Sequence, residues 1–132
     1  PAMIEAGVDV RLGTDGAASN NGLDMRAEAK AASLIQRHDH WDATILDPVE
    51  TWQLATRGSS DWVTWDLSDI RMRPRGRGGR RILSNLIYSG AQCVDVFVDG
   101  IAIRRGGRTL TLNEGKVAQE LEDAAQEYYS EI

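Results

Sequence analysis

Residues 12–25 of the chain read LGTDGAASNNGLDM. The residues just before them, Val8–Leu12, alternate apolar and charged side chains, which predicts a short half-buried strand. The segment Gly13–Gly16 then breaks the alternation and predicts a polar loop, because Asp and Gly tolerate turn geometry. Residues 1–6 are expected to end a helix that Gly7 closes. The order helix, strand and loop is typical of an α/β unit.

The loop leads into two predicted helices. The Ser-Asn-Asn run at 19–21 can cap a helix over residues 23–37. A second helix should begin near residue 48, because Asp47 can cap it, Pro48 suits the first helical position and Glu50 can complete a reciprocal cap. The apolar positions expected to be buried are Ala27, Ala31, Leu34 and Ile35 in the first helix and Val49, Trp52 and Ala55 in the second.

Residues that favour β-structure dominate much of the second half of the chain. Trp62–Trp65 and Cys93–Val98 are predicted strands. Asp99-Gly100 is a two-residue turn that should return residues 101–104 as the hairpin partner of the second strand. Residues 109–112 are expected to form one more short strand.

Two charged segments complete the pattern. Arg71–Arg81 holds six arginines and three glycines in eleven residues, which predicts a loop because almost nothing apolar is available to bury. Asn113 is expected to cap an acidic final helix. The inner face expected for this helix consists of Val117, Leu121, Ala124 and Tyr128.

Composition narrows the class of protein. The hydrophobic fraction of 42% and the charged fraction of 27% are those of a globular domain, and no apolar run is long enough to span a bilayer. A net charge of -5 argues against nonspecific nucleic-acid binding by the whole surface. Cys93 is the single cysteine, so an intramolecular disulfide is impossible and a cytoplasmic location is the simplest expectation.

The residues at 12–25 closely resemble a segment of the amidohydrolase superfamily, in the branch that contains S-adenosylhomocysteine and methylthioadenosine deaminases and the triazine chlorohydrolases. In that branch the segment is the last barrel strand and the loop after it. The resemblance continues through residues 47–56, 84–90 and 96–100. One departure is that relatives carry a helix end and a Gly-rich hairpin between the counterparts of Ser60 and Asp61.

This resemblance implies an α/β fold, namely the C-terminal part of a metal-dependent (β/α)8 barrel, plus strands of the accessory β-sandwich and a terminal helix. Residues 1–58 would carry the last barrel strand and its flanking helices. Residues 59–132 would carry the sandwich strands and the closing helix.

The resemblance also implies hydrolysis of C–N bonds, as in deamination of a purine-like heterocycle, or less readily dechlorination of a triazine-like one, at a zinc or iron centre. Asp15 matches the family's aspartate at the end of the last barrel strand, which coordinates the metal and moves the proton of the metal-bound water. Ser19 and Asn20 are candidates to contact the small heterocyclic substrate. The family's histidine ligands and catalytic glutamate have no counterparts here, so the chain alone is expected to bind no metal and to be inactive.

Other interpretations of these motifs stay open. Taken by itself, Asp15 also fits an ordinary turn at the end of a strand. His38-Asp39-His40 resembles the family's own His-x-His metal motif, but it trails a helix, so a solvated loop is favoured. The arginine segment at 71–81 could contact RNA, yet no aromatic residue interleaves with the arginines, and nucleic acid is not expected as a partner.

A different class of function is a non-catalytic remnant module. A lone barrel strand presents unpaired backbone edges, so such a module would self-associate or bind a partner that supplies the missing barrel portion. The sequence indicates no membrane segment in either case.

Overall fold

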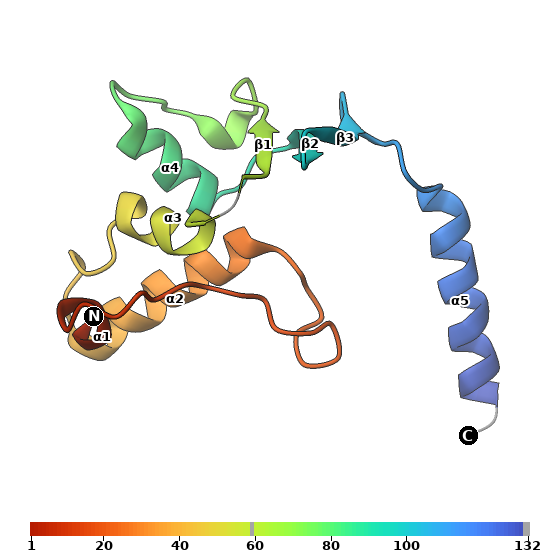
Figure 1. Ribbon diagram of the computed structural model, residues 1–132, viewed down its shortest axis with the longest axis horizontal. Coiled ribbons are helices and arrows are strands. Elements are labelled where there is room, and N and C mark those ends of the chain that lie inside the picture. Colours follow the sequence, from red (N-terminus) through yellow and green to blue (C-terminus); the bar gives the residue numbers. More distant parts are fainter. Residues whose placement is uncertain (59, 131–132) are drawn as a thin grey trace. The chain divides into compact units, whose positions relative to one another are not determined.

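The computed structural model describes residues 1–58 and 60–130 and combines helices with one antiparallel sheet (Figure 1). Contacts divide the described residues into two compact units, 1–58 with 67–91 and 60–66 with 92–130. In chain order the elements are α1 (Ala2–Glu5), α2 (Met25–His40), α3 (Pro48–Thr56), β1 (Trp62–Trp65), the 3₁₀ turn η1 (Ile70–Met72), α4 (Gly79–Tyr88), β2 (Cys93–Val98), β3 (Ile101–Arg105), β4 (Arg108–Thr109) and α5 (Glu114–Ser130).

A shared carbonyl group ties together the helices of the first unit. The Leu46 carbonyl, just before α3, accepts hydrogen bonds from Ser33 Oγ at 3.1 Å, Thr51 Oγ1 at 2.8 Å and Arg37 Nη2 at 3.0 Å. The Ser33 hydroxyl also lies 2.7 Å from the hydroxyl of Tyr88, at the end of α4. These bonds join α2, α3 and α4, and they satisfy the polar groups of Ser33 and Thr51, which are fully buried.

The buried faces of α2 and α3 differ from the predicted ones. In α2 the buried residues are Ala29 and Ser33, whereas Leu34 and Ile35 are exposed. Small side chains let the backbones of neighbouring helices come close, and the hydrogen bonds of Ser33 hold this face inward. In α3 the buried residues are Thr51 and Leu54, whereas the positions predicted to be buried, Val49, Trp52 and Ala55, are only half-buried.

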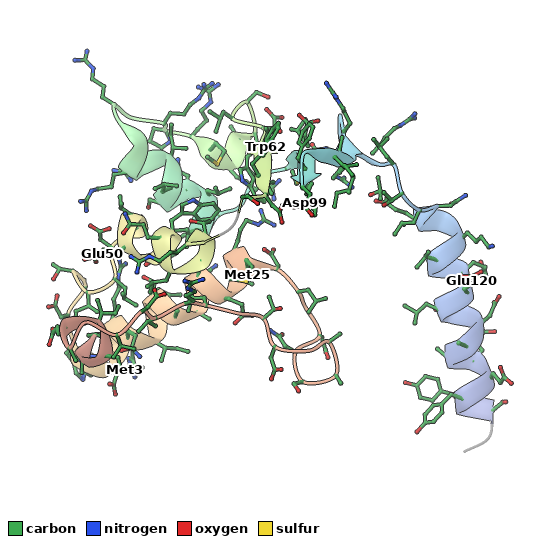
Figure 2. The ribbon with its side chains drawn as sticks, viewed as in Figure 1. Met3, Met25, Glu50, Trp62, Asp99 and Glu120 are labelled. Atoms are coloured by element: carbon green, nitrogen blue, oxygen red, sulfur yellow. The ribbon has the colours of Figure 1, made fainter. Side chains whose placement is uncertain are left out.

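Helix capping follows the sequence closely in one helix and less closely in the other. The reciprocal cap of α3 by Asp47 and Glu50 is confirmed, with Pro48 at the first position. Asp24 rather than the Ser-Asn-Asn run caps α2, accepting a hydrogen bond from the Arg26 N–H at 2.9 Å. The cap shifts because the Ser-Asn-Asn run is held in a loop of its own, so α2 begins at Met25, labelled in Figure 2.

The strand predicted at Val8–Leu12 does not form within the described part of the chain. The segment after α1 has no sheet partner there; the N–H of Val8 donates to the Met3 carbonyl at 2.9 Å, and the N–H of Leu12 donates to the carbonyl of Leu54 at 2.9 Å. A β-strand is defined by its hydrogen bonds to a neighbouring strand, and no described residue pairs with Val8–Leu12 in this way. The end of α1 is as predicted, because Gly7 adopts a positive φ of 79°.

The second unit contains a four-stranded antiparallel sheet in the order β1-β2-β3-β4. The strands at Trp62–Trp65 and Cys93–Val98 and the hairpin turn at Asp99-Gly100 are confirmed, and both turn residues have the positive φ angles that such a turn requires. Trp62 on β1 stacks on Phe97 of β2 with ring centroids 3.8 Å apart. Figure 2 labels Trp62 and Asp99 on this sheet.

Three predictions for the second half need correction. The strand expected over 109–112 is limited to β4, because only Arg108 and Thr109 pair with β3. The arginine segment is not entirely a loop, since α4 begins at Gly79 and includes Arg80 and Arg81. The helix α5 forms and Asn113 accepts a hydrogen bond from the Lys116 N–H, but its apolar face remains exposed among the described residues.

None of the helices in the described part of the chain combines the length and the apolar character needed to cross a lipid bilayer.

The shared carbonyl of Leu46 predicts the effect of replacing Thr51. Thr51→Val keeps the shape of the side chain but removes the hydroxyl that donates to Leu46. We expect the free energy of unfolding to fall by about 1 kcal/mol, measured by urea denaturation. Thr56→Val in the same helix is the matched control, because among the described residues the Thr56 hydroxyl donates to the exposed carbonyl of Trp52, one turn earlier in α3. Its removal should lower the free energy of unfolding by less than about 0.5 kcal/mol. Equal losses in both variants would contradict the role of Leu46.

The Asp47 cap should make α3 sensitive to acid. The hydrogen bond from the Glu50 N–H is the main cause that lowers the pKa of Asp47, with contributions from Val49 and Arg80. Because the folded-state pKa lies below the unfolded one, the stabilisation is complete above roughly pH 4 and disappears as the pH falls through the folded pKa. Asp47→Asn keeps an acceptor oxygen that does not titrate. Its urea midpoint should therefore change less than that of the wild type between about pH 6 and about pH 3.

Candidate functional site

Asp15 lies in the irregular segment that joins α1 to α2 in the first unit (Figure 1). Its side chain is exposed, and its backbone has a φ of 57°, in the left-handed region that few residues other than glycine adopt. One carboxylate oxygen, Oδ1, accepts a hydrogen bond from the Gly16 N–H at 2.7 Å. Oδ2 makes no hydrogen bond or ion pair with any residue that the structure describes. That oxygen is therefore available to a ligand.

The segment before Asp15 is attached to the end of α3. The Leu12 N–H bonds to the carbonyl of Leu54, and the Asp9 carboxylate pairs with Arg11 at 2.8 Å and with Arg57 at 3.1 Å. These two arginines, Arg11 first, hold the pKa of the Asp9 carboxyl below its usual value. All three charged side chains are about half exposed, so solvent screens the pairs and they orient the segment more than they stabilise it.

The loop after Asp15 closes on itself and on α2. The Gly16 carbonyl accepts hydrogen bonds from the backbone N–H groups of Ser19 and Asn20, each at 3.0 Å. The side chain of Asn20 is half-buried and donates to the Thr14 carbonyl at 3.1 Å and to Glu28 Oε1 at 2.7 Å. Ser19 is exposed, and its hydroxyl has no partner among the described residues.

The three predicted site residues therefore differ in exposure and in the direction of their side chains. Asn20 points back to the peptide before Asp15 rather than outward, whereas Ser19 and Asp15 present their side chains to solvent. Sequence reasoning missed Glu28, which lies in the first turns of α2 and accepts a hydrogen bond from the Asn20 amide. An acidic residue early in a helix is common enough that its spacing from Asn20 gives no specific signal.

The His38-Asp39-His40 motif, predicted to lie in a solvated loop, lies instead in the last turn of α2, and all three residues are exposed. Residues two apart on a helix point away from one another, so the two imidazoles cannot chelate one ion. His40 Nδ1 lies 3.0 Å from the Gln36 carbonyl, and the ring of His38 lies 5.8 Å from that of Trp41. Both rings thus have structural partners.

The donor set for a metal is incomplete in the part of the chain that the structure describes, where no group of three or more His, Cys, Asp or Glu residues could hold an ion. The Asp15 carboxylate could serve as a single metal ligand, because one of its oxygens has no partner among the described residues. One carboxylate by itself is insufficient for tight binding of a catalytic metal.

An apolar pocket of about 420 Å³ lies beside this segment within the first unit. Its walls come from α1, from the segment before Asp15, from α2 and from α3. They include Met3, Val10, Leu12, Ile35 and Leu54. The pocket is thus lined by apolar side chains of the segment before Asp15 and by the exposed Ile35 of α2.

Comparison with known proteins identifies the class to which this arrangement is related. The structure matches that of an adenosine deaminase from Xanthomonas campestris with bound zinc, with a TM-score of 0.85 and 27% sequence identity over 98% of this chain and 33% of that one. The chain is homologous to the C-terminal portion of amidohydrolase-type deaminases, which confirms the resemblance carried by residues 12–25.

More particularly, the chain is 37% identical over 133 residues to the 5-methylthioadenosine/S-adenosylhomocysteine deaminase of Bacillus cytotoxicus. It is also 37% identical over 136 residues to the enzyme of the same name from Bacillus thuringiensis. In each case 88% of this chain is matched, but it spans only 30% of the length of the relative. No family model matches the chain.

The geometry of the histidine pair predicts that it has no role in metal binding. The double variant His38→Gln and His40→Gln should leave the zinc content unchanged in a protein that joins this chain to the preceding portion of a zinc-binding relative. The physical reason is the opposite orientation of the two rings on α2. Metal analysis of the purified protein is the measurement, and a loss of zinc in the variant would show that the pair is a ligand.

Proposed function

We propose that this chain provides the metal-binding aspartate and the adjoining substrate loop of an amidohydrolase-type deaminase, and that the enzyme hydrolyses the exocyclic C–N bond of a purine-like heterocycle. The observation that carries the proposal is Asp15 on an anchored loop with one carboxylate oxygen free, in a chain homologous to named deaminases. The metal would be zinc or iron. The zinc reported for the Xanthomonas structure supports a metal of this kind in the family.

The reaction adds water to the ring carbon that bears the amino group, forms a C–O bond and releases ammonia as the C–N bond breaks. When bound, the metal lowers the pKa of a coordinated water so that hydroxide is available near neutral pH. Asp15 would bind the metal through the free Oδ2, and its carboxylate would accept the proton of the attacking water and then return that proton to the leaving amino group. Ser19, exposed four residues further along the same loop, is free to contact the substrate.

The architecture of the whole enzyme is part of the proposal. Residues 1–58 would contribute the last strand and helices of a (β/α)8 barrel, and the sheet of the second unit would belong to an accessory β-sandwich. The absence of a pairing partner for Val8–Leu12 among the described residues supports this view, because a barrel would supply strands on both of its edges. Names of the relatives favour an adenosine-like substrate over a chlorinated triazine.

A non-catalytic module is the second candidate, and the exposed face of α5 favours it. Leu121 and Tyr128 are 71% and 63% exposed, and α5 has no buried residue. A helix with this apolar stripe normally packs against another surface. In this case the chain would self-associate or bind a partner, and it would have no hydrolytic activity in any assembly.

A chimeric protein tests the proposed function directly. The C-terminal 30% of the Bacillus cytotoxicus deaminase would be replaced by this chain, and zinc content and ammonia release from 5-methylthioadenosine, S-adenosylhomocysteine and adenosine would be measured. We expect about one zinc per molecule and activity with at least one of these nucleosides. Asp15→Asn should lower kcat by about 100-fold or more, because it removes both a ligand charge and the proton acceptor.

Asp39→Asn is the matched control, because it neutralises an exposed carboxylate of the same unit whose one partner among the described residues is His40. It should leave zinc content and kcat unchanged. The chain of 132 residues by itself should bind no zinc and release no ammonia. A folded chimera that binds zinc but keeps full activity in the Asp15→Asn variant would refute the role of Asp15, and an inactive chimera that forms stable dimers through this chain would favour the module.

A further inference from the structure

We infer that Asn20, supported by Glu28, is a positioning residue that holds Asp15 in its metal-binding conformation. The inference rests on the proposed role of Asp15 as a metal ligand. It gives Asn20 a different task from the substrate contact that the sequence suggested. The relevant geometry is the pair of hydrogen bonds from the Asn20 amide, one to the Thr14 carbonyl and one to Glu28 Oε1.

The bond to Thr14 acts on the conformation of Asp15 for a simple geometric reason. The Thr14 carbonyl and the Asp15 N–H belong to one planar peptide group. Rotation of that plane about the N–Cα bond of Asp15 is the φ angle of Asp15. A hydrogen bond that holds the carbonyl at 3.1 Å from Asn20 Nδ2 therefore restrains φ, which is 57° here.

The bonds between adjacent residues hold this angle only in part. The Thr14 hydroxyl donates to the Asp15 carbonyl at 3.1 Å, and the Gly16 N–H donates to Asp15 Oδ1, but both bonds join adjacent residues and move with the loop. An aspartate adopts left-handed backbone less readily than glycine, so contacts from surrounding structure help to keep it there. Asn20 provides that structure because it connects the peptide before Asp15 to a helix.

Glu28 provides the fixed point. It lies in α2, next to the buried Ala29, and its carboxylate accepts the second Asn20 proton at 2.7 Å. A hydrogen bond to an ionised acceptor is stronger than one between neutral groups. Asn20 Oδ1 in turn accepts the Gly22 N–H at 3.4 Å, so all parts of the amide are used. The amide thus has a single orientation, with its two protons directed to Thr14 and Glu28.

The key test variant is Asn20→Asp, which keeps the size of the side chain and the acceptor for Gly22 but places oxygen against the Thr14 carbonyl and against Glu28. In the chimera with the Bacillus deaminase we expect zinc affinity, measured by competition with a chelator, to fall about 10-fold to 100-fold. We expect kcat to fall with it and KM to change little. Asn21→Asp is the matched control, because Asn21 is exposed and has no partner among the described residues.

A double variant separates positioning from mere stability. Combining Asn20→Asp with Glu28→Gln reverses donor and acceptor, so the bond between loop and helix can form again, whereas the repulsion at Thr14 remains. If Asn20 positions Asp15, the double variant should regain most of the Tm that Asn20→Asp loses but not the zinc affinity. Glu28→Gln alone keeps an acceptor oxygen and should remain within about threefold of the wild-type affinity. Recovery of zinc affinity in the double variant would overturn the positioning role.

The conformation of Asp15 can also be measured in the chain of 132 residues, without a metal. A positive φ brings the amide and α protons of one residue close, so Asp15 should show a strong intraresidue nuclear Overhauser effect that weakens in Asn20→Asp and stays in Asn21→Asp. An unchanged signal in Asn20→Asp would overturn the inference. This result does not depend on catalysis: an inactive wild-type chimera refutes the proposed function, whereas an active one whose Asn20→Asp variant binds zinc normally refutes only the role of Asn20.

Discussion

The carbonyl of Leu46 is the acceptor on which the first unit depends. Donors from α2 and α3 converge on it, and through Ser33 it is connected to Tyr88 at the end of α4. Leu46 itself has a φ of 48°, an unfavourable conformation for a leucine that costs about 1 kcal/mol. Several hydrogen bonds of about 1 kcal/mol each offset this cost. Without these donors the buried carbonyl of Leu46 would destabilise the folded state. The connection before α3 is therefore set by polar groups as well as by the buried side chain of Leu46.

This arrangement has consequences for the candidate site, because the segment before Asp15 is attached to the same helices. Leu54 is buried in α3, and its carbonyl holds the N–H of Leu12. On the other side of the loop, Asp24 caps α2, and Arg26 donates to the Ala91 carbonyl at 2.9 Å. The loop that bears Asp15 is thus fixed at both ends to one helical unit. A loop fixed at both ends can present an exposed carboxylate in a defined direction without burying it.

Much of the local structure could be predicted from the sequence, and the reasons are physical. Asp47, Pro48 and Glu50 act within one helical turn, and Asp99-Gly100 fits a turn in which both residues have positive φ, so short-range chemistry determines both features. The family resemblance at residues 12–25 is equally local and was confirmed. These are features in which neighbouring residues contain all the necessary information.

Features that depend on distant partners could not be predicted in the same way. The apolar stripe of α2 pointed to Leu34 and Ile35 as the buried face, but the buried serine of that helix finds its partners at Leu46 and Tyr88, which no periodicity reveals. The strand at Val8–Leu12 failed for the opposite reason, since the pattern is that of a strand while the described residues include no neighbour for it.

The same distinction explains the candidate site. Asp15 could be proposed as a candidate because its residue type and flanking glycine are part of a recognisable motif. Glu28 could not, because its importance lies only in the 2.7 Å contact with an amide eight residues earlier. A candidate metal ligand can be recognised from its residue type. The residues that hold its conformation are of types common throughout proteins, so the sequence does not single them out. For a candidate site on an exposed loop, the structure is therefore needed to identify the residues that hold the loop. Here the hydrogen bonds of Asn20 hold the loop, whereas in a buried site side-chain packing would do so.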